Sequence, residues 1–379
     1  MSRATRFLIH EQPFAFLRGG ELPGIALAYE TWGALNADRS NAILILTGLS
    51  PGAHAASNEA DHTDGWWEFM IGPGKPIDTE RYFVICVNSL GSCKGSTGPS
   101  SPRPESGAPW RTDFPELTLE DVAASTWLVV QDLGIERLCA VIGPSMGGMT
   151  ALALLKQHPT GVRHMVNISS APRAEPFSIA VRSLQREMIV TDPNWKDGWY
   201  SNDCWPENGM RMARKLGMIS YRSAIEWQDR FGRDRQYHFP RQFYGMTFEI
   251  ESYLEYAARK FIGAFDPCSY VYLSRAMDWF DASAEFDDLP HALQDVRLES
   301  ALIIGVLTDV LFPNRQQREI ASGLKAVGVN TELELLASPQ GHDAFLVDQE
   351  NFGTLLGEFL DGIWRSDLAP GPGRATGKP

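Results

Sequence analysis

The sequence predicts an α/β protein in which helices cover both faces of a mostly parallel sheet. Short apolar runs at 41–48, 82–88, 138–143 and 162–168 suit buried strands. Stretches of helical spacing separate the later runs. Strands that alternate with helices are typical of a parallel sheet with crossover connections. A nucleophile motif between one strand and one helix, described below, narrows this class further.

The elements before residue 174 follow from local patterns. Residues 24–33 (GIALAYETWG) alternate and are rich in aromatics, as a half-buried strand should be. Thr118 and Asp121 form a looser capping box at the start of a helix, which ends at Gly134. Residues 147–157 (GGMTALALLKQ) look like a second helix, which stops near Pro159.

The strand–helix alternation breaks between about 175 and 295. This stretch is rich in Arg, Trp, Tyr and Met and contains no convincing buried strand. We expect helices there at 177–190, 209–216, 250–263 and 269–280. Strands are expected again at 299–308 and 330–337, and helices at 314–326 and 350–364. The sequence therefore predicts a core formed by 1–174 and 296–368, a helical lid at 175–295 and a disordered tail at 369–379.

Composition limits the classes of partner. The net charge of -13 argues against nucleic acid or an anionic membrane as partner, because both attract basic surfaces. No run approaches the ~20 apolar residues of a membrane helix, and the first residues lack the apolar region of a secretory signal. The five cysteines are odd in number and show no metal-ligand spacing. We expect free thiols, a cytoplasmic protein and no metal site.

The strongest local motif is Gly143-Pro144-Ser145-Met146-Gly147, which follows an apolar strand and opens an apolar helix. This context is what the G-x-S-x-G nucleophile elbow requires. The tight turn needs small neighbours and exposes the serine hydroxyl at the carboxyl edge of the sheet. The motif predicts an α/β-hydrolase fold with Ser145 as nucleophile.

A serine hydroxyl needs a base and an orienting acid. In this fold they follow the nucleophile in the order Asp, His. Asp309 ends the strand ALIIGVLTDV, and His342 lies on a loop after the next strand, at the edge where Ser145 lies. Of the other seven histidines only His54 is expected near that edge. It precedes the nucleophile, so we assign it a supporting role at most.

The oxyanion hole is expected to use two backbone N–H groups. One belongs to Met146, which follows the nucleophile, and the other to Leu49 in the loop after the early strand. The elbow alone does not distinguish transfer of an acyl group to an acceptor from transfer to water. An esterase or thioesterase is therefore an alternative, and a binding protein without catalysis on this fold is a more distant one.

Long ordered segments make the chain resemble the homoserine O-acyltransferases, which are acyl-CoA-dependent enzymes of the α/β-hydrolase fold. The matching segments are AYETWG at 28–33, the run GWWEFMIGPGKPIDTERYFVICVNSLGSCKGSTGPSS at 65–101, DFPELTLED at 113–121, GPSMGGM at 143–149, MARKLGMISY at 212–221, FGRD at 231–234 and GHDAFLVD at 341–348.

The resemblance implies a double displacement through an acyl-Ser145 intermediate, with acyl-CoA as co-substrate and no bound cofactor. It also implies that Arg214 of the lid and Asp343 hold the amino-acid acceptor. Both assignments are physically reasonable, because a zwitterion needs a cation for its carboxylate and an anion for its ammonium group. The lid would cover Ser145 and supply the contact of a homodimer.

Departures from the usual homoserine pattern indicate a particular branch. The loop after the early strand reads Thr47-Gly48-Leu49-Ser50-Pro51, and Pro144 stands where glycine is common. Arg182 stands where asparagine is common, and Leu311 replaces an arginine that resembles a succinyl-CoA selector. These features look most like the serine O-succinyltransferase branch. We expect the residues that set specificity to be Gly48, Leu49, Ser50, Pro51 and Arg182.

We therefore expect serine O-succinylation, a step of cysteine biosynthesis. Arg182 would pair with the succinyl carboxylate; the alternative is an arginine on an outer face of the lid. Homoserine O-acetylation or O-succinylation, a step of methionine biosynthesis, is the second reading. Serine and homoserine differ by one methylene, which a pocket discriminates by only ~1–3 kcal/mol.

Overall fold

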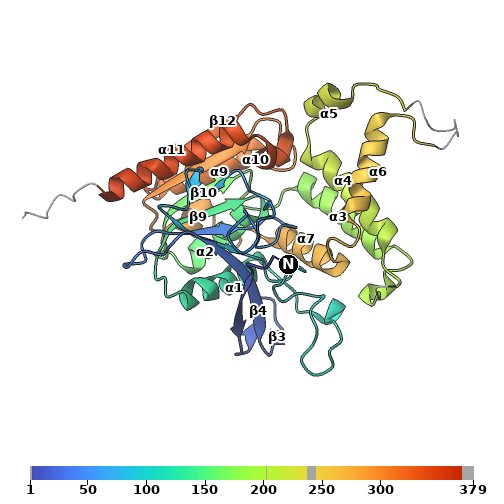
Figure 1. Ribbon diagram of the computed structural model, residues 1–379, viewed down its shortest axis with the longest axis horizontal. Coiled ribbons are helices and arrows are strands. Elements are labelled where there is room, and N and C mark those ends of the chain that lie inside the picture. Colours follow the sequence, from blue (N-terminus) through green and yellow to red (C-terminus); the bar gives the residue numbers. More distant parts are fainter. Residues whose placement is uncertain (1, 202, 237–244, 369–379) are drawn as a thin grey trace, which may run out of the picture.

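The structure is a computed structural model that describes residues 2–201, 203–236 and 245–368. A mixed sheet and its helices make up one part of the molecule, and helices between residues 176 and 261 extend to one side of it (Figure 1). The tail at 369–379, which we expect to be disordered, lies outside the described residues.

The central sheet has eight strands in the order β1-β4-β8-β5-β9-β10-β11-β12. Both pairings of β4, with β1 and with β8, are antiparallel, and all other neighbours are parallel. This mostly parallel sheet confirms the predicted fold class. The strands are β1 (Arg6–His10), β4 (Ile25–Trp32), β5 (Ala42–Leu46), β8 (Phe83–Val87), β9 (Leu138–Pro144), β10 (Val162–Ile168), β11 (Ser300–Val306) and β12 (Asn330–Leu336). Two short ribbons, β2 (Phe14–Ala15) with β3 (Glu21–Leu22) and β6 (Ile71–Gly72) with β7 (Ile77–Asp78), flank the sheet.

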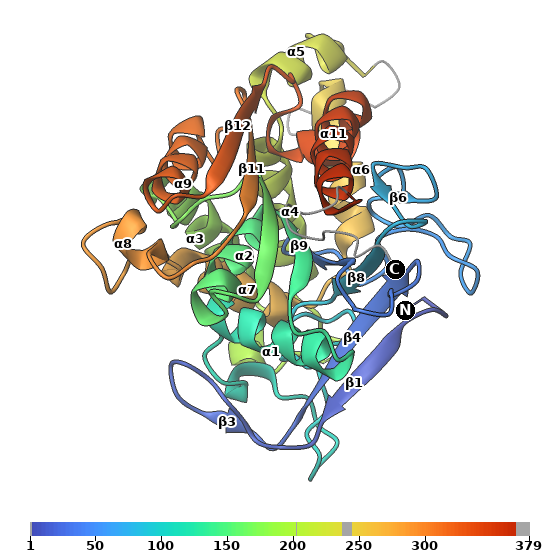
Figure 2. The same ribbon diagram turned by 90° about the vertical axis from the view of Figure 1, so that its left-hand side faces the viewer.

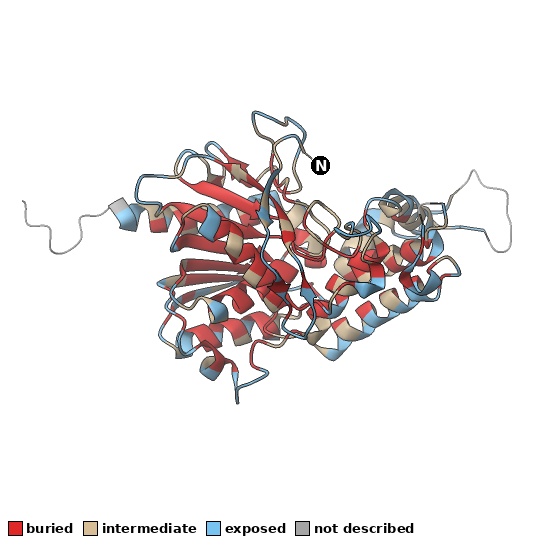
Figure 3. Ribbon diagram, turned by 90° about the horizontal axis from the view of Figure 1, so that it is seen from below, coloured by how far each residue is buried: buried red, intermediate tan, exposed pale blue. Residues whose placement is uncertain are grey.

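The buried strands divide the core into two apolar layers. In β5, Leu44 and Leu46 contribute to one layer and Ile43 and Ile45 to the other, because successive side chains point to opposite faces. The first layer packs against α1 (Leu119–Asp132), α2 (Met146–Gln157) and α9 (Asn314–Ala326), and the second against α11 (Gln349–Leu368). Figure 3 shows the buried sheet between partly exposed helices.

Between residues 175 and 295, the described regular elements longer than three residues are all α-helices. They are α3 (Pro176–Val190), α4 (Glu207–Tyr221), α5 (Ala224–Phe231), α6 (Glu249–Phe261), α7 (Pro267–Trp279) and the short α8 (Leu289–Leu293). Helix α4 packs between α3 and α6, and glycines at its contact with α3 allow a close approach. Helix α8 instead packs against α2 and α9 of the core (Figure 2). The lid that we expect at 175–295 therefore includes one helix that lies on the core.

Several local predictions need correction. Strand β4 is almost fully buried rather than half-buried, because its side chains contribute to both apolar layers, Leu27 and Tyr29 to one and Trp32 to the other. The edge strand β1 and the helices α5 and α8 are not anticipated by the sequence patterns. Helix α4 continues to Tyr221, five residues beyond its expected end. The capping box on α1 is present as predicted, with Thr118 and Asp121 each accepting from the other's backbone N–H.

Other observations concern expected absences. None of the described helices is both long and apolar enough to cross a bilayer. All five cysteines are free. Within the described residues, no group of three or more His, Cys, Asp or Glu side chains is placed to hold a metal ion.

Candidate active site

Ser145 lies on the turn between β9 and α2. Its φ of 56° is in the left-handed region, which costs energy for a non-glycine residue and marks a strained turn. A Cβ on Gly147 would collide with the Leu46 carbonyl oxygen, and a Cβ on Gly143 with the backbone of Gly147. The Ser145 N–H donates to the Ile168 carbonyl at 2.8 Å. The small residues of the motif therefore allow the close packing that fixes the serine.

His342 and Asp309 complete a linear arrangement with Ser145. The Nε2 atom of His342 lies 2.8 Å from the Ser145 Oγ, and its Nδ1 lies 2.8 Å from the Asp309 Oδ2. The other Asp309 oxygen accepts the N–H groups of Leu311 and Phe312 at 2.8 and 2.9 Å. These two bonds fix the carboxylate, which in turn orients the imidazole.

The surroundings of His342 favour its protonated form. Burial disfavours the imidazolium, but the charge of Asp309 and the hydrogen bond to it outweigh this effect and raise the pKa of His342 above its ordinary value. The ring also stacks on Phe312 with 4.9 Å between centroids. Asp309 therefore stabilises the cation that forms when His342 accepts a proton from Ser145.

The two N–H groups predicted for an oxyanion hole are free to bind an anion. Met146 is the first residue of α2, where backbone N–H groups have no partner within the helix. Among the described residues, neither the Met146 nor the Leu49 N–H donates to a protein acceptor. Leu49 also lines the cavity that contains Ser145. The arrangement is suited to stabilising negative charge beside the nucleophile.

One cavity brings together most of the residues that the sequence singles out. Its wall includes two members of the relay, Ser145 and His342. The other predicted residues in its wall are Gly48, Leu49, Ser50, Pro51, Arg182, Arg214 and Asp343. Leu311 lines it too. Side chains of the lid helices α3, α4, α6 and α7 close it from the other side.

Arg182 is buried in this cavity, with 4% of its surface exposed, so the alternative of an outer-face arginine is wrong. Its Nε donates to the Asp278 Oδ1 at 2.5 Å, and its Nη2 donates to the Ser178 Oγ at 3.2 Å. Its Nη1 is buried without a hydrogen-bond partner among the described residues. Asp278 also pairs with Arg186 at 2.6 Å. Two cations share one carboxylate, so this side of the cavity carries excess positive charge.

Arg214 and Asp343 lie in the same cavity but have different partners. The guanidinium of Arg214 lies 4.5 Å from the Phe261 ring centroid. Asp343 pairs with the Nε of Arg222 at 3.2 Å. Burial raises the pKa of Asp343, although Arg222, His342 and Arg214 oppose the shift. Arg214 and Asp343 therefore offer a cation and a carboxylate to a small zwitterion in this cavity.

Some contributors to this site are not found by the sequence reasoning, among them Arg222, Asp278 and Trp66. Arg222 pairs with Asp343 in the structure. In the sequence it looks like an ordinary solvated charge, because it directly follows the helix α4. Asp278 lies 96 residues from its partner Arg182, a separation that no local pattern spans. Trp66 lines the cavity, and its only signal is its place in the segment GWWEFM.

Comparison with known proteins agrees with this geometry. A family model described as the alpha/beta hydrolase fold matches residues 41–349. A serine O-succinyltransferase of Stenotrophomonas maltophilia (strain K279a) is 58% identical over 365 residues, which cover 95% of this chain and 98% of that protein. The chain belongs to the α/β-hydrolase fold family, in its serine O-succinyltransferase branch. The family resemblance predicted from the sequence is thereby confirmed.

Solved structures similar to this chain include a transferase and an esterase. A homoserine O-acetyltransferase from Bacillus anthracis has a TM-score of 0.86 and 30% identity, covering 94% of this chain and 97% of its own. Esterase E22 has a TM-score of 0.85 and 27% identity, covering 94% and 99%. The same architecture therefore occurs in proteins named for transfer and in proteins named for hydrolysis.

Proposed function

We propose that the protein is an L-serine O-succinyltransferase that moves a succinyl group from succinyl-CoA to the serine hydroxyl. The observation that carries the proposal is the complete Ser145–His342–Asp309 relay, set in one cavity with the buried Arg182, whose Nη1 has no hydrogen-bond partner among the described residues. The near full-length relatives that bear this name support the choice of substrates. The protein is thus an acyl-CoA-dependent acyltransferase, with acyl-CoA as a co-substrate.

The reaction has two halves that use the same groups. His342 accepts the Ser145 proton while Ser145 attacks the thioester carbonyl. The N–H groups of Leu49 and Met146 stabilise the resulting oxyanion, and coenzyme A leaves with the proton from His342. His342 then deprotonates the hydroxyl of the incoming serine, which attacks the acyl-Ser145 ester. The product is O-succinylserine, and Ser145 recovers its proton.

The acceptor would be held by charge at both of its ends. We assign Arg214 to the carboxylate of serine and Asp343 to its ammonium group, since both side chains line the cavity of Ser145. Asp343 already pairs with Arg222, so the ammonium group would share this carboxylate rather than find it unpaired. Pro51, whose carbonyl accepts from the Asn88 side chain at 3.3 Å, would narrow the space beside the hydroxyl.

Replacing Arg182 by alanine should change the choice of acyl donor. The unpaired Nη1 of Arg182 is suited to the terminal carboxylate of succinyl-CoA, which acetyl-CoA lacks. A hydrogen bond to a charged group contributes about 1.5–3 kcal/mol, so the ratio of succinyl-CoA to acetyl-CoA kcat/KM should fall by about ten- to a hundredfold. Asp278 would keep Arg186 as partner, so no bare carboxylate is buried.

Arg211→Ala is the matched control, because Arg211 lies on lid helix α4 and its partner Glu255 also pairs with Lys215 and Arg259. Its donor ratio should equal that of the wild type. An unchanged ratio in Arg182→Ala would show that Arg182 does not select the donor.

The proposed function is tested by release of free coenzyme A from purified protein. Succinyl-CoA and acetyl-CoA would each be offered with L-serine, with L-homoserine and with no acceptor. We expect turnover only with succinyl-CoA and serine. Turnover mainly with homoserine would keep the mechanism and change the acceptor. Rapid release without any acceptor would favour an esterase or thioesterase, the alternative that the likeness to esterase E22 supports.

The setting of the reaction follows from its product. An acylated serine has a better leaving group than serine itself, and a sulfur nucleophile can displace it, which is the chemistry of cysteine biosynthesis. The five free thiols support a reducing cytoplasmic location. That location and the homodimer implied by the family resemblance stay predictions.

A further inference from the structure

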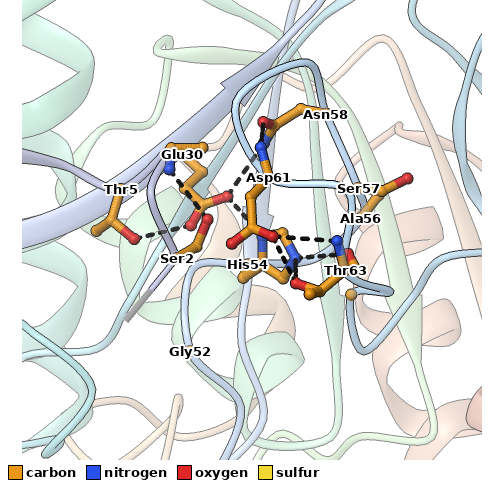
Figure 4. A network of polar contacts seen from close by, with 12 residues as sticks. Ser2, Thr5, Glu30, Gly52, His54, Ala56, Ser57, Asn58, Asp61 and Thr63 are labelled. Carbon is orange, nitrogen blue, oxygen red and sulfur yellow. Dashed lines mark hydrogen bonds and ion pairs between the residues drawn. The ribbon is translucent and has the colours of Figure 1, made fainter.

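His54, whose side chain is 19% exposed, belongs to a partly buried polar network between strand β4 and the loop after β5 (Figure 4). Its Nδ1 lies 2.9 Å from the Oε2 of Glu30, a residue of β4 with no exposed surface. The other Glu30 oxygen accepts the Thr5 hydroxyl at 2.8 Å. The Nε2 of His54 lies 2.9 Å from the Thr63 carbonyl oxygen. None of these contacts involves Ser145, Asp309 or His342.

The partners of His54 require a charged ring. A carboxylate and a carbonyl oxygen only accept hydrogen bonds, so both ring nitrogens must carry a proton. The Thr63 hydroxyl could otherwise donate a hydrogen bond to an unprotonated Nε2 of His54. It donates its proton to Asp61 at 2.7 Å instead. Glu30 and His54 therefore form an ion pair between a strand of the core and the loop that follows β5.

The charges around His54 favour the same state. Burial disfavours the imidazolium, but the bonds to Glu30 and Thr63 and the charges of Glu30 and Asp61 raise the pKa of His54 above its ordinary value. Hydrogen bonds from Thr63 hold the pKa of Asp61 below its usual range, so it remains an anion. Beside Glu30, burial raises the pKa of the Cys86 thiol of β8, which therefore stays neutral.

Backbone and side-chain bonds link His54 to the wall of the active-site cavity. The His54 carbonyl accepts the Trp66 N–H at 3.3 Å, and the Gly52 carbonyl accepts the Trp66 indole N–H at 3.1 Å. Trp66 and the segment from Gly48 to Pro51 line the cavity. The position of His54 thus constrains both ends of the loop segment from Gly52 to Trp66, which begins three residues after Leu49, the residue predicted to supply an oxyanion N–H.

We propose that the His54–Glu30 ion pair positions the loop of Leu49, Pro51 and Trp66 for acyl transfer, and that it does so only while His54 is protonated. His54 is a positioning residue, since it acts through the loop and not on the substrate. The stabilisation of the loop is complete below the ordinary histidine pKa of about 6.5 and is lost as pH rises through the raised pKa of His54.

This inference rests on the proposed function only for the choice of substrates, so the test uses two assays. The first is succinyl transfer from succinyl-CoA to serine. The second is acylation by p-nitrophenyl acetate, which requires only the nucleophile, its base and the oxyanion hole. This substrate has no group that titrates in the pH range tested. Both would be measured between pH 5 and 9.5 for the wild type, His54→Gln, Glu30→Gln and the control His62→Gln. His62 is an exposed histidine of the same loop.

The wild type and His62→Gln should show a rise and then an alkaline fall in the acylation rate. The acylation rate of His54→Gln at its optimum should be about ten- to a hundredfold lower, because a small misplacement of a reacting group lowers the rate by such a factor. The alkaline fall should be lost in this variant. In Glu30→Gln the fall should move to lower pH, because the anion that stabilises the imidazolium is gone.

Any of three results would overturn the inference. The first is a His54→Gln profile that matches His62→Gln in rate and shape. The second is a wild-type profile without an alkaline fall, and the third is an alkaline fall that persists unchanged in His54→Gln. If p-nitrophenyl acetate reproduces the predicted pattern while succinyl transfer is absent in the wild type, the proposed substrates are wrong and the positioning role of His54 stands.

Discussion

Ser145→Ala should reduce release of coenzyme A by at least about 10⁴-fold, the largest effect expected of any single change. The hydroxyl is the only group within hydrogen-bond reach of the His342 Nε2 among the described residues, so no other side chain there can take its place. The fold should persist, because the elbow is held by backbone bonds and by close glycine packing. The measurement is single-turnover release of coenzyme A, with mass spectrometry for a succinyl group on Ser145.

Ser183→Ala provides the control, since Ser183 is an exposed serine on lid helix α3 that bonds only within its own helix. It should retain wild-type activity and acquire the succinyl label at Ser145. A labelled protein in the Ser145→Ala variant would contradict the assignment of the nucleophile.

The sheet core and the Ser145–His342–Asp309 relay can be predicted from local sequence patterns. The contacts to the amino-acid acceptor and to the acyl donor cannot. Strands such as 138–143 can be recognised in the sequence, because strands buried on both faces consist of continuous apolar segments. Ser145, Asp309 and His342 are visible because each follows a strand, and the carboxyl ends of parallel strands meet at one edge. The strand β1 is missed because its side chains are mostly exposed and give no apolar pattern.

The lid shows where sequence reasoning reaches its limit. Arg182 stands out only through the family resemblance, since the sequence alone cannot tell a buried arginine from a solvated one. In the structure, Asp278 of α7 accepts a hydrogen bond from the Arg182 Nε. The Arg182 Nη1 has no hydrogen-bond partner among the described residues. Similarly, the sequence assigns His54 a supporting role at most, and its partner Glu30 lies in a strand that the sequence predicts only as a structural element. Contacts between distant segments decide both roles.

Asp309→Asn should lower kcat by about 10⁴-fold while leaving the fold intact. The amide can keep the bonds from the Leu311 and Phe312 N–H groups, so its position should hold. It cannot stabilise the imidazolium of His342, and an amide N–H toward Nδ1 would hold the ring in the wrong tautomer. The loss is therefore one of base strength and orientation rather than of substrate binding, and KM for succinyl-CoA should change little.

The same substitution should change the pH dependence in a defined direction. His342 acts as a base only when neutral, so wild-type activity falls as pH falls through its raised pKa. Without the Asp309 charge that pKa decreases, and the acidic limb of the residual activity should move to lower pH. Asp295→Asn, a change at an exposed aspartate before β11, should leave the limb in place. An Asp309→Asn limb at the wild-type position would mean that a group other than His342 governs it.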